Sequence, residues 1–319
     1  MRVLVTGGAG YIGSTLVPLL LAAGHRVRVV DALLHGGEPL LPVFADPAFE
    51  FVHSDLTAAG TVQAAVSGMD AVVHLAAIVG DPACARQPER AKAVNLDASL
   101  ALLAAARDAG TKRFVFASTC SNYGRMKDPS TLVDENSELA PVSLYAETKV
   151  AMERALLAER GLAASPLRFA TVYGVSARMR FDLTVNEFTM EMLTKGKLIV
   201  FGEQFWRPYI HVRDAARALA LVLSAPESAV GGRVFNVGST TQNYQKKQLI
   251  DLIRPHAPGA AVEYVHRDED PRDYRVSFER VRSELGFESA RTVPDGIAEV
   301  ARLVRSGVIS NFDDSRYRN

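Results

Sequence analysis

The chain is 319 residues long and 48% hydrophobic, so it can bury a large α/β domain together with a smaller companion, and a disordered or fibrous protein is excluded. Lys plus Arg and Asp plus Glu both number 36, and this zero net charge provides no global basic field for nucleic acid or an anionic membrane. The two cysteines, Cys84 and Cys120, are too few for a disulfide framework and lack metal-ligand spacing. The first predicted strand begins at Arg2, which leaves no room for a signal peptide, and no apolar run reaches about 18 residues. We therefore expect a cytoplasmic protein with no metal site and no nucleic-acid or membrane partner.

The first predicted elements are a strand, Val3–Val5, a glycine turn and a helix, Ile12–Ala23. The turn contains Gly7, Gly10 and Gly13. Gly7 permits a sharp turn, Gly10 lets the backbone approach a pyrophosphate, and Gly13 lets the helix pack on the strand without an intervening Cβ. The phosphate would lie at the helix N-terminus, where free N–H groups and the helix dipole favour an anion. A bare structural turn is the alternative interpretation, because a glycine-rich turn alone is a weak signal.

A second predicted strand, Arg26–Val30, leads to Asp31. A strand, a glycine turn, a helix and a second strand with an acidic end are typical of a dinucleotide site, where the carboxylate accepts hydrogen bonds from the adenosine ribose. The carboxylate also repels a 2′-phosphate, and no Arg follows it in residues 32–34. The pattern therefore predicts NAD rather than NADP as the cofactor.

Strands and helices continue to alternate after this unit. The predicted strands are Phe51–Asp55, Ala71–Ala77, Arg113–Ser118 and Ser165–Phe169, and the predicted helices are Thr61–Val66, Glu89–Ala109 and Ser143–Arg160. This order predicts βαβ units, and hence an α/β fold with a doubly wound parallel sheet of the Rossmann type. Asp55 and Leu56 follow a strand end that would face the adenine, although a solvated loop carboxylate is an equal alternative for Asp55. His74 is interpreted as a packed core residue.

The alternation changes beyond Gly174. A predicted helix near Asn186–Leu193 is followed by two predicted strands, Arg207–Val212 and Arg233–Val237. Both strands are expected to return to the main sheet, and the rest of this part of the chain is expected to form a second lobe.

The predicted domain boundaries follow from this change. Residues 1–171 and the returning segments at about 209–240 are expected to form an NAD-binding Rossmann domain. Residues 172–208 and 241–319 are expected to form a smaller C-terminal α/β lobe that binds the substrate. The polar segment from Asn311 onward is expected to be frayed.

Tyr145 and Lys149 are four residues apart in a predicted helix, so their side chains share one face. An ammonium beside a phenol favours the phenolate, so Lys149 is expected to lower the pKa of Tyr145. Such a tyrosine takes a proton from a substrate hydroxyl while hydride passes to NAD. An exposed surface pair is the alternative for this spacing alone. Thr119 argues against that alternative, because it follows a buried strand at the carboxyl edge, where open α/β sheets bind ligands.

Several motifs together give the chain a resemblance to a known family. They are Gly7-x-x-Gly10-x-x-Gly13, Asp31, Asp55-Leu56, His74-Leu75-Ala76-Ala77, Asn95, Ser118-Thr119-Cys120-Ser121-Asn122-Tyr123-Gly124, Tyr145-x-x-x-Lys149 and Arg207-Pro208-Tyr209-Ile210-His211-Val212. This combination resembles the extended short-chain dehydrogenase/reductase family, and within it the nucleotide-sugar epimerases and dehydratases. The resemblance covers nearly the whole chain. It implies a Rossmann fold, NAD, a nucleotide-diphosphate sugar as substrate, and a homodimer built from the helices at 89–109 and 143–160.

The resemblance also implies roles for individual residues. Thr119, Tyr145 and Lys149 would form the catalytic triad, with Tyr145 as acid/base and Lys149 on the nicotinamide ribose. Arg207 and Arg275 would grip the diphosphate of the substrate, which argues against a dehydrogenase of non-sugar alcohols. The cofactor would be bound by Gly7, Gly10, Tyr11, Ile12, Gly13, Asp31, Asp55, Leu56, Leu75, Ala76, Ala77, Asn95, Tyr145 and Lys149, and the substrate by Thr119, Ser121, Asn186, Arg207 and Arg275.

The chain departs from the dehydratase pattern directly after Thr119. The 4,6-dehydratases of the family usually have Asp and Glu there, as acid and base for water elimination, whereas this chain has Cys120 and Ser121. Cys120 is either an acid/base of an unusual epimerisation or elimination, since a thiol near a cation titrates toward neutrality, or a small residue packed under the sugar. The leading interpretation is a nucleotide-sugar epimerase acting at C4, and the alternative is a dehydratase or 4-keto reductase. A regulatory binding protein would not need Thr119, Tyr145 and Lys149 together.

Overall fold

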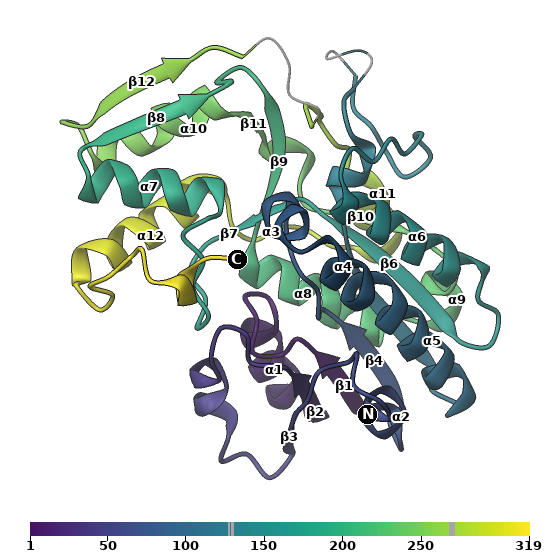
Figure 1. Cartoon of the computed structure of the whole chain (residues 1–319). Coiled ribbons are helices and arrows are strands. Elements are labelled where there is room, and N and C mark those ends of the chain that lie inside the picture. The colour runs from purple at the N-terminus through teal and green to yellow at the C-terminus, as the bar shows by residue number, and fades with distance from the viewer. Residues whose placement is uncertain (127, 129–130, 268–271) are drawn as a thin grey trace.

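The computed structural model describes residues 1–126, 128, 131–267 and 272–319. A seven-stranded parallel sheet lies at its centre (Figure 1). The strands of this sheet are β1 (Arg2–Thr6), β2 (Arg26–Asp31), β3 (Phe49–His53), β4 (Ala71–His74), β5 (Arg113–Thr119), β6 (Ala163–Phe169) and β10 (Phe235–Val237). They are arranged in the order β10-β6-β5-β4-β1-β2-β3, and all neighbours are parallel. The predicted sheet of the Rossmann type is confirmed.

The direction in which strands are added reverses next to β1. The chain runs from β1 outward through β2 to β3, then returns to β4 on the other side of β1 and continues through β5 and β6. The connections that follow β1 and β4 therefore diverge, and open α/β sheets bind ligands at such a switch point. The reversal places the glycine turn after β1 beside the segment that follows β4.

Helices cover both faces of the main sheet. They are α1 (Gly13–Ala22), α2 (Thr61–Val66), α5 (Ala98–Asp108), α6 (Leu144–Ala158), α8 (Val212–Ser224) and α9 (Glu227–Val230). Val3 and Val5 of β1 share a core with α1 and α8, whereas Leu4 shares a core with α2, α5 and α6. Because side chains alternate along a strand, both faces of the sheet are buried.

The predicted helix Glu89–Ala109 is a helical run with a wider turn in its middle. It consists of α4 (Pro88–Lys92), a π-helical segment (Ala93–Asp97) and α5, and α3 (Asp81–Arg86) precedes it. Turns of π-helix within α-helices often occur at functional sites. Asn95 lies in the π-helical segment, and its side-chain amide bonds to both the N–H and the carbonyl of Ile78, at 2.8 and 2.9 Å. The segment thereby fixes the connection that follows β4.

The second lobe begins where the chain leaves β6 (Figure 1). Its elements are β7 (Thr171–Tyr173), α7 (Thr184–Thr194), β8 (Lys197–Phe201), β9 (Trp206–His211), β11 (Asn243–Gln245), α10 (Lys246–Ile253), β12 (Ala261–Val265) and α12 (Val293–Ser306). One small sheet has the order β11-β9-β7, and another pairs β12 with β8 in parallel. Tyr173, Val185, Leu249 and Ile297 lie in the core that holds these elements together.

Two segments occupy different places from those predicted. Arg207–Val212 was expected in the main sheet, but β9 pairs in parallel with β7 and in antiparallel with β11. The prediction fails because β5 and β10 already occupy the two edges of β6, and β7 offers β9 a free edge. The other predicted strand does join the main sheet, as β10. A helix within the predicted substrate lobe, α11 (Glu279–Leu285), packs against β10 of the main sheet.

The segment from Asn311 onward is packed rather than frayed, contrary to the prediction. The ring of Phe181 meets those of Phe312 and Tyr317 edge-on, with ring centres 5.1 and 5.9 Å apart. The N–H of Phe181 also donates to the carbonyl of Tyr317 at 2.9 Å. These two aromatic side chains anchor an otherwise polar segment, and Asn319 reaches the wall of the cavity described below.

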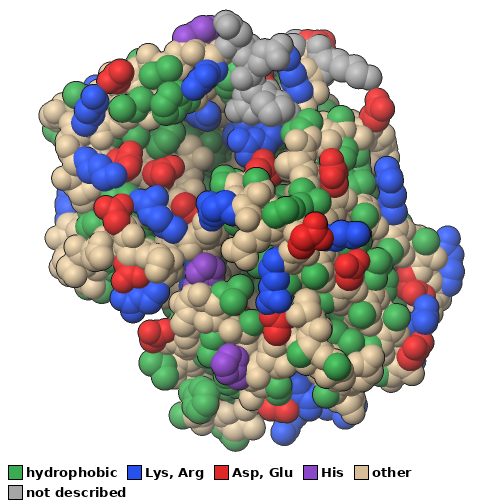
Figure 2. Space-filling view, viewed as in Figure 1, with side chains coloured by type: hydrophobic (Ala, Val, Ile, Leu, Met, Phe, Trp, Pro, Cys, Tyr) green, Lys and Arg blue, Asp and Glu red, His purple; other side chains and the backbone are tan. Residues whose placement is uncertain are grey.

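Charged side chains of both signs are interspersed over the face shown in Figure 2. Within the described ranges, no helix is long and apolar enough to cross a membrane. The same residues contain no group of three His, Cys, Asp or Glu side chains that could hold a metal ion.

Candidate active site

A cavity of about 470 Å³ opens at the carboxyl edge of the main sheet, and both lobes contribute to its wall. This volume lies in the usual range for small-molecule sites. The predicted site residues that line it are Gly7, Gly10, Tyr11, Ile12, Gly13, Asp31, Asp55, Leu56, Leu75, Ala76, Ala77, Thr119, Ser121, Tyr145, Lys149 and Arg207. The fold thus gathers residues from the ends of five strands, β1 to β5, together with residues of α6 and β9, around one space.

The glycine turn forms one wall of this cavity. Gly7 has a φ of 75°, and a Cβ built there would lie 2.7 Å from the backbone nitrogen of Ala76. A Cβ on Gly13 would lie 2.3 Å from the carbonyl oxygen of Gly7, so helix α1 packs on the turn only because this residue has no side chain. No side chain caps the N-terminus of α1. Its first N–H groups and dipole therefore favour an anion, and the turn fits the diphosphate of a dinucleotide.

Asp31 lies at the end of β2, beside the glycine turn. Its two carboxylate oxygens accept hydrogen bonds from the N–H groups of Ala9 and Leu33, at 2.9 and 2.8 Å. Burial raises the pKa of Asp31, and these hydrogen bonds oppose that effect. Each oxygen keeps a second lone pair, so the fixed carboxylate can still accept hydrogen bonds from ribose hydroxyls.

Asp55 and Leu56 continue this wall on the far side of β2. The Asp55 carboxylate pairs with Arg90 and accepts two hydrogen bonds from Thr57. Partial burial raises the pKa of Asp55, but the bonds from Thr57 and Arg90 outweigh burial and lower it overall. Asp55 is therefore a paired carboxylate in the cavity wall and not a free, solvated loop carboxylate, which was the alternative interpretation. Arg90 also lines the cavity and extends the wall beyond the predicted residues.

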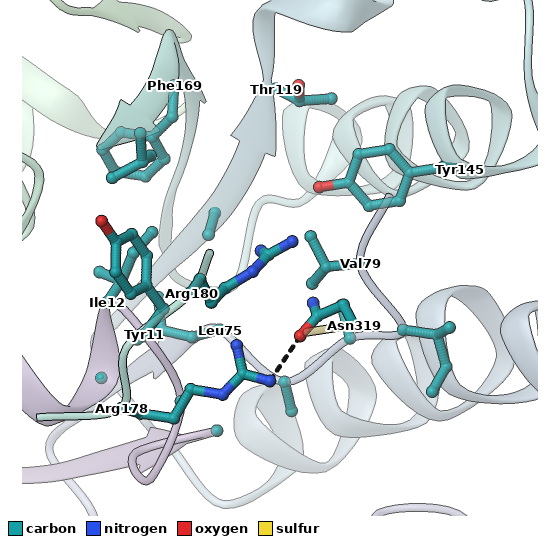
Figure 3. Close-up of a pocket in the computed structure, with 18 of the residues that line it drawn as sticks. Tyr11, Ile12, Leu75, Val79, Thr119, Tyr145, Phe169, Arg178, Arg180 and Asn319 are labelled. Carbon is teal, nitrogen blue, oxygen red and sulfur yellow. Dashed lines mark hydrogen bonds between the residues drawn. The ribbon is translucent and has the colours of Figure 1, made fainter. Parts of the chain in front are cut away.

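The three predicted catalytic residues meet at the junction of β5 and α6. Thr119 ends β5, and Tyr145 and Lys149 lie one turn apart on α6, whose first turn is capped by Ser143. Figure 3 shows the hydroxyl of Tyr145 projecting into the cavity, with Thr119 on the adjoining segment. Thr119 accepts a hydrogen bond from the N–H of Ser121 at 3.1 Å, which leaves its own O–H available as a donor.

Burial is the largest influence on the pKa of both members of the Tyr145 and Lys149 pair. It raises the pKa of Tyr145 and lowers that of Lys149 from 10.5 to about 8. The expected lowering of the tyrosine pKa by Lys149 is therefore not found in this structure. The ammonium instead donates to the carbonyl of Ala117 at 2.8 Å and lies 4.5 Å from the ring centre of Phe116.

A buried ion pair supports the end of β5 from behind. Nη2 of Arg168 lies 2.7 Å from Oε2 of Glu153, and both side chains are almost fully buried. The Glu153 carboxylate also accepts hydrogen bonds from Ser118 and Asn122, on either side of the Thr119 segment. This network fixes the segment that carries Thr119, and Arg168, Glu153 and Asn122 do so from outside the cavity wall. The only sequence signal for it is Glu153 four residues after Lys149 in the same helix.

Two predicted site residues near this junction do not line the cavity. Cys120 is fully buried, donates to the carbonyl of Arg168 at 3.2 Å, and has a pKa raised well above its usual value by burial. It faces the core because the backbone turns its side chain to the side opposite Thr119. Asn95 lies behind Ile78 and bonds to its backbone, so it shapes the wall through that residue.

The two other residues outside the cavity wall were predicted to bind substrate. Asn186 is fully buried, accepts from the N–H of Gly174 at 2.9 Å and donates to the hydroxyl of Tyr11 at 3.1 Å. It positions Tyr11 rather than a ligand. The guanidinium of Arg275 lies 4.7 Å from the ring centre of Trp206 and outside the cavity wall.

Sequence reasoning missed several polar residues of the cavity wall besides Arg90, among them Arg178, Arg180, Arg272 and Tyr274. Arg272 and Tyr274 lie two residues apart, so in an extended segment their side chains share one face. This spacing places Arg272, rather than Arg275, on the side of the segment that faces the cavity. Arg272 donates to Asp81 at 3.0 Å, and the hydroxyl of Tyr274 is 3.3 Å from that of Ser121. No sequence signal identified Arg178 or Arg180, because they belong to an irregular connection between β7 and α7.

Comparison with known proteins agrees with this topology and this site. The profile of the NAD-dependent epimerase/dehydratase family matches residues 3–238. The chain belongs to this family. The cofactor is NAD, on which this family depends. The glycine turn and Asp31 of the chain agree with that cofactor.

Relatives in the NAD-dependent epimerase/dehydratase family include two kinds of enzyme. A UDP-glucose 4-epimerase of Corynebacterium glutamicum is 30% identical over 313 residues, which cover 92% of each protein. A dTDP-glucose 4,6-dehydratase of Streptomyces niveus is 30% identical over 319 residues, which cover 96% of this chain and 93% of the relative. The solved structure of a dTDP-glucose 4,6-dehydratase of Streptomyces venezuelae, with NAD and TYD bound, has a TM-score of 0.85 and 31% identity, and covers 96% of this chain and 97% of that one.

Proposed function

We propose that this member of the family is a nucleotide-sugar 4-epimerase. The observation that carries the proposal is the position of the carboxylates in the cavity. Among the described residues of the cavity wall, Asp31 and Asp55 have the only carboxylate side chains, and both belong to the wall formed by the ends of β2 and β3. Water elimination by the usual route needs an acid and a base beside the sugar. The two positions after Thr119 instead hold a thiol buried in the core and a hydroxyl.

The residues around the glycine turn would hold NAD. Gly7 and Gly13 allow the tight turn that would bring its diphosphate to the N-terminus of α1, and Asp31 would accept hydrogen bonds from the adenosine ribose. Leu75, Ala76 and Ala77 present mostly small side chains after β4, which lets a flat ring system pass. These placements fit the cofactor on which the family depends.

The sugar would react between Thr119 and Tyr145. NAD, when bound, supplies the hydride acceptor at the sugar carbon and returns the hydride later. The Tyr145 oxygen, deprotonated to the phenolate beside the positive charges of Lys149 and of bound NAD, would take the proton of the sugar hydroxyl and give it back, while the free O–H of Thr119 holds the same oxygen. Lys149, protonated below a pH of about 8, supplies positive charge beside the phenol. Return of the hydride to the opposite face of the sugar would invert C4 with no net redox change.

The nucleotide-diphosphate part of the substrate would extend toward the smaller lobe. Arg207 and Arg272 line that part of the cavity, and the guanidinium of Arg207 lies 5.4 Å from the ring centre of Tyr274. A guanidinium held against a ring is well placed to bind phosphate oxygens in a fixed geometry. Arg272 replaces Arg275 in the pair of arginines that we expect to bind the diphosphate.

The test is to incubate the protein with UDP- and dTDP-linked hexoses and to identify the products by NMR in D2O. A 4-epimerase interconverts two sugars that differ in the configuration at C4, and it incorporates no deuterium into the ring. A dehydratase would instead produce a 4-keto sugar with a new methyl group and deuterium from the solvent. A 4-keto reductase would act only on a keto sugar with NADH added. Either of these two outcomes would refute the 4-epimerase proposal.

A further inference from the structure

Arg178 is tied to the glycine turn although the two are far apart in the sequence. The N–H of Arg178 donates to the hydroxyl of Ser14 at 3.3 Å, and Ser14 lies in the first turn of α1. Ser176 bonds to the same hydroxyl at 2.8 Å and donates to the carbonyl of Tyr11 at 2.7 Å. The connection between β7 and α7 is thus attached to the N-terminus of α1, where the fold favours an anion.

The guanidinium of Arg178 lines the cavity and has only neutral partners. Its Nη2 donates to the carbonyl of Arg318 at 3.0 Å and to Oδ1 of Asn319 at 2.7 Å (Figure 3). Its Nε is buried and has no hydrogen-bond partner among the described residues. Burial and the nearby Arg180 lower the pKa of Arg178 to about 10, so its positive charge is poorly compensated. An unsatisfied N–H of this kind in a buried position has a cost unless a ligand binds it.

Arg180 provides a comparison two residues along the chain. Its Nε and Nη2 donate to the two carboxylate oxygens of Asp182, at 2.9 and 2.6 Å. Arg180 is therefore neutralised by a forked ion pair, whereas none of the described carboxylates forms an ion pair with Arg178. The two arginines line the same cavity but differ in whether their charge is already paired.

We propose that Arg178 binds the diphosphate of NAD from the side opposite the glycine turn, with phosphate oxygens replacing the neutral oxygens of Arg318 and Asn319. The exchange is favourable because phosphate oxygens carry the negative charge that these two neutral oxygens lack, and they can accept forked hydrogen bonds from a guanidinium. The diphosphate would then be held by backbone N–H groups of α1 on one side and by a guanidinium on the other. This inference rests on NAD being the cofactor, but not on the reaction being an epimerisation.

The position of Arg178 favours the diphosphate of the cofactor over that of the substrate. Its backbone is bonded to α1, and its charge acts on Asp31 in the adenosine half of the cavity. The arginines proposed for the substrate, Arg207 and Arg272, lie instead with Tyr274 on the smaller lobe. The two diphosphates would thus be bound by separate arginines.

The test is to titrate the wild type, Arg178→Gln and Arg178→Lys with NAD, with UDP and with adenosine, which lacks phosphate, in a calorimeter. Loss of a charge-assisted contact predicts that Arg178→Gln binds NAD at least roughly tenfold more weakly, with unchanged affinity for adenosine. Arg178→Lys should retain part of the affinity, because it keeps the charge and loses the fork. The dependence of NAD affinity on salt should be weaker in Arg178→Gln than in the wild type.

Arg213→Gln is the matched control, because Arg213 is exposed and lies outside the cavity wall. Circular dichroism and thermal unfolding would show whether the variants are folded. If Arg178→Gln is not folded, the NAD affinity of Arg178→Lys provides the test. Unchanged NAD affinity in Arg178→Gln, an equal loss of NAD and adenosine affinity, or a loss of UDP affinity without a loss of NAD affinity would each overturn the proposal. Each of these results would leave the 4-epimerase proposal intact. A wild type that binds no NAD would refute both.

Discussion

The ammonium of Lys149 lies 5.8 Å from the centre of the Tyr145 ring, but its hydrogen bond goes to the carbonyl of Ala117. The two residues share one face of α6 and line the same cavity, so the helix places a phenol and a cation side by side without joining them directly. This arrangement separates two roles. Tyr145 lines the cavity, where the proposed reaction places the sugar, and Lys149 supplies charge and bonds to the strand end that carries Thr119.

Tyr145→Phe should abolish turnover and leave NAD affinity nearly unchanged. The substitution removes one oxygen, so packing is preserved while the proton acceptor for the sugar hydroxyl is lost. Loss of a positioned acid/base typically lowers the rate by about 10²- to 10⁴-fold. Product formation and calorimetric NAD affinity, measured on the same preparation, check the prediction. A variant that turns over like the wild type would remove Tyr145 from the mechanism.

The variants Thr119→Ala and Lys149→Met test how much the other two residues contribute to the rate. Thr119→Ala should lower the rate less than Tyr145→Phe, because it removes a hydrogen bond rather than the proton carrier. Lys149→Met should lower both the rate and the NAD affinity. Cys120→Ser should remain active, since Cys120 is buried in the core. An inactive Cys120→Ser with an active Tyr145→Phe would move the chemistry to the thiol.

The stability of the protein should depend on the ionisation of Lys149. Its pKa in the folded protein is about 8, below the ordinary 10.5, so between these pH values the unfolded chain holds more protons. Stability rises with pH where the unfolded state binds more protons, so the Lys149 contribution to the free energy of unfolding should increase across this window. The increase has an upper bound of about 3 kcal/mol.

Urea denaturation of the wild type and Lys149→Met at several pH values isolates this contribution, because the other titrating groups are common to both proteins. The difference in unfolding free energy should shift in favour of the wild type as the pH rises from 8 to 10.5. A difference that stays constant, or shifts the other way, would contradict a lowered pKa for Lys149.

The wild type should bind NAD more tightly than NADP. Asp31 is fixed by the N–H groups of Ala9 and Leu33, and its carboxylate would face the 2′-phosphate of NADP. In Asp31→Asn the charge is lost while an oxygen remains to accept a hydrogen bond, so the preference should shrink by roughly tenfold, about the size of one like-charge contact. Calorimetric titration with both dinucleotides measures the preference, and tighter NADP binding by the wild type would refute it.

The protein should be a dimer formed through α5 and α6. Leu100 on α5 is 37% exposed although it lies among apolar residues of a core-facing helix. Two-fold interfaces are the commonest in soluble oligomers. Light scattering at micromolar concentration should give twice the chain mass for the wild type and the chain mass for Leu100→Glu. Val308→Glu, at another exposed apolar residue, is the control and should remain dimeric; a monomeric wild type would contradict the prediction.

The sequence alone was sufficient to predict those parts of the fold and the site that depend on short-range patterns. The glycine turn, the strand ends at Asp31 and Thr119, and the helical spacing of Tyr145 and Lys149 each depend on neighbouring residues, and all of them reach the cavity wall. The failures involve long-range choices. The pairing of β9 with β7, and the packing of Phe312 and Tyr317 on Phe181, depend on partners that no local pattern specifies.

The same distinction explains the site residues that sequence reasoning misplaced. Cys120 and Asn186 were assigned from the resemblance to the family, but their side chains turn toward Arg168 and Gly174 in the interior. Arg178 was missed because it lies in an irregular connection whose residues Ser176 and Arg178 reach α1 through hydrogen bonds to Ser14. Side-chain direction in such segments is set by the tertiary fold.

The burial of both thiols has a practical consequence for spectroscopy. Cys84 and Cys120 are 1% and 0% exposed, and burial raises the pKa of each. Thiolate is the form that reacts with maleimides, so neither residue should be labelled in the folded protein. A cysteine engineered at an exposed position such as Val308, which is 79% exposed, would take up a fluorophore selectively. Movements of the smaller lobe could therefore be followed in solution without first removing the native cysteines.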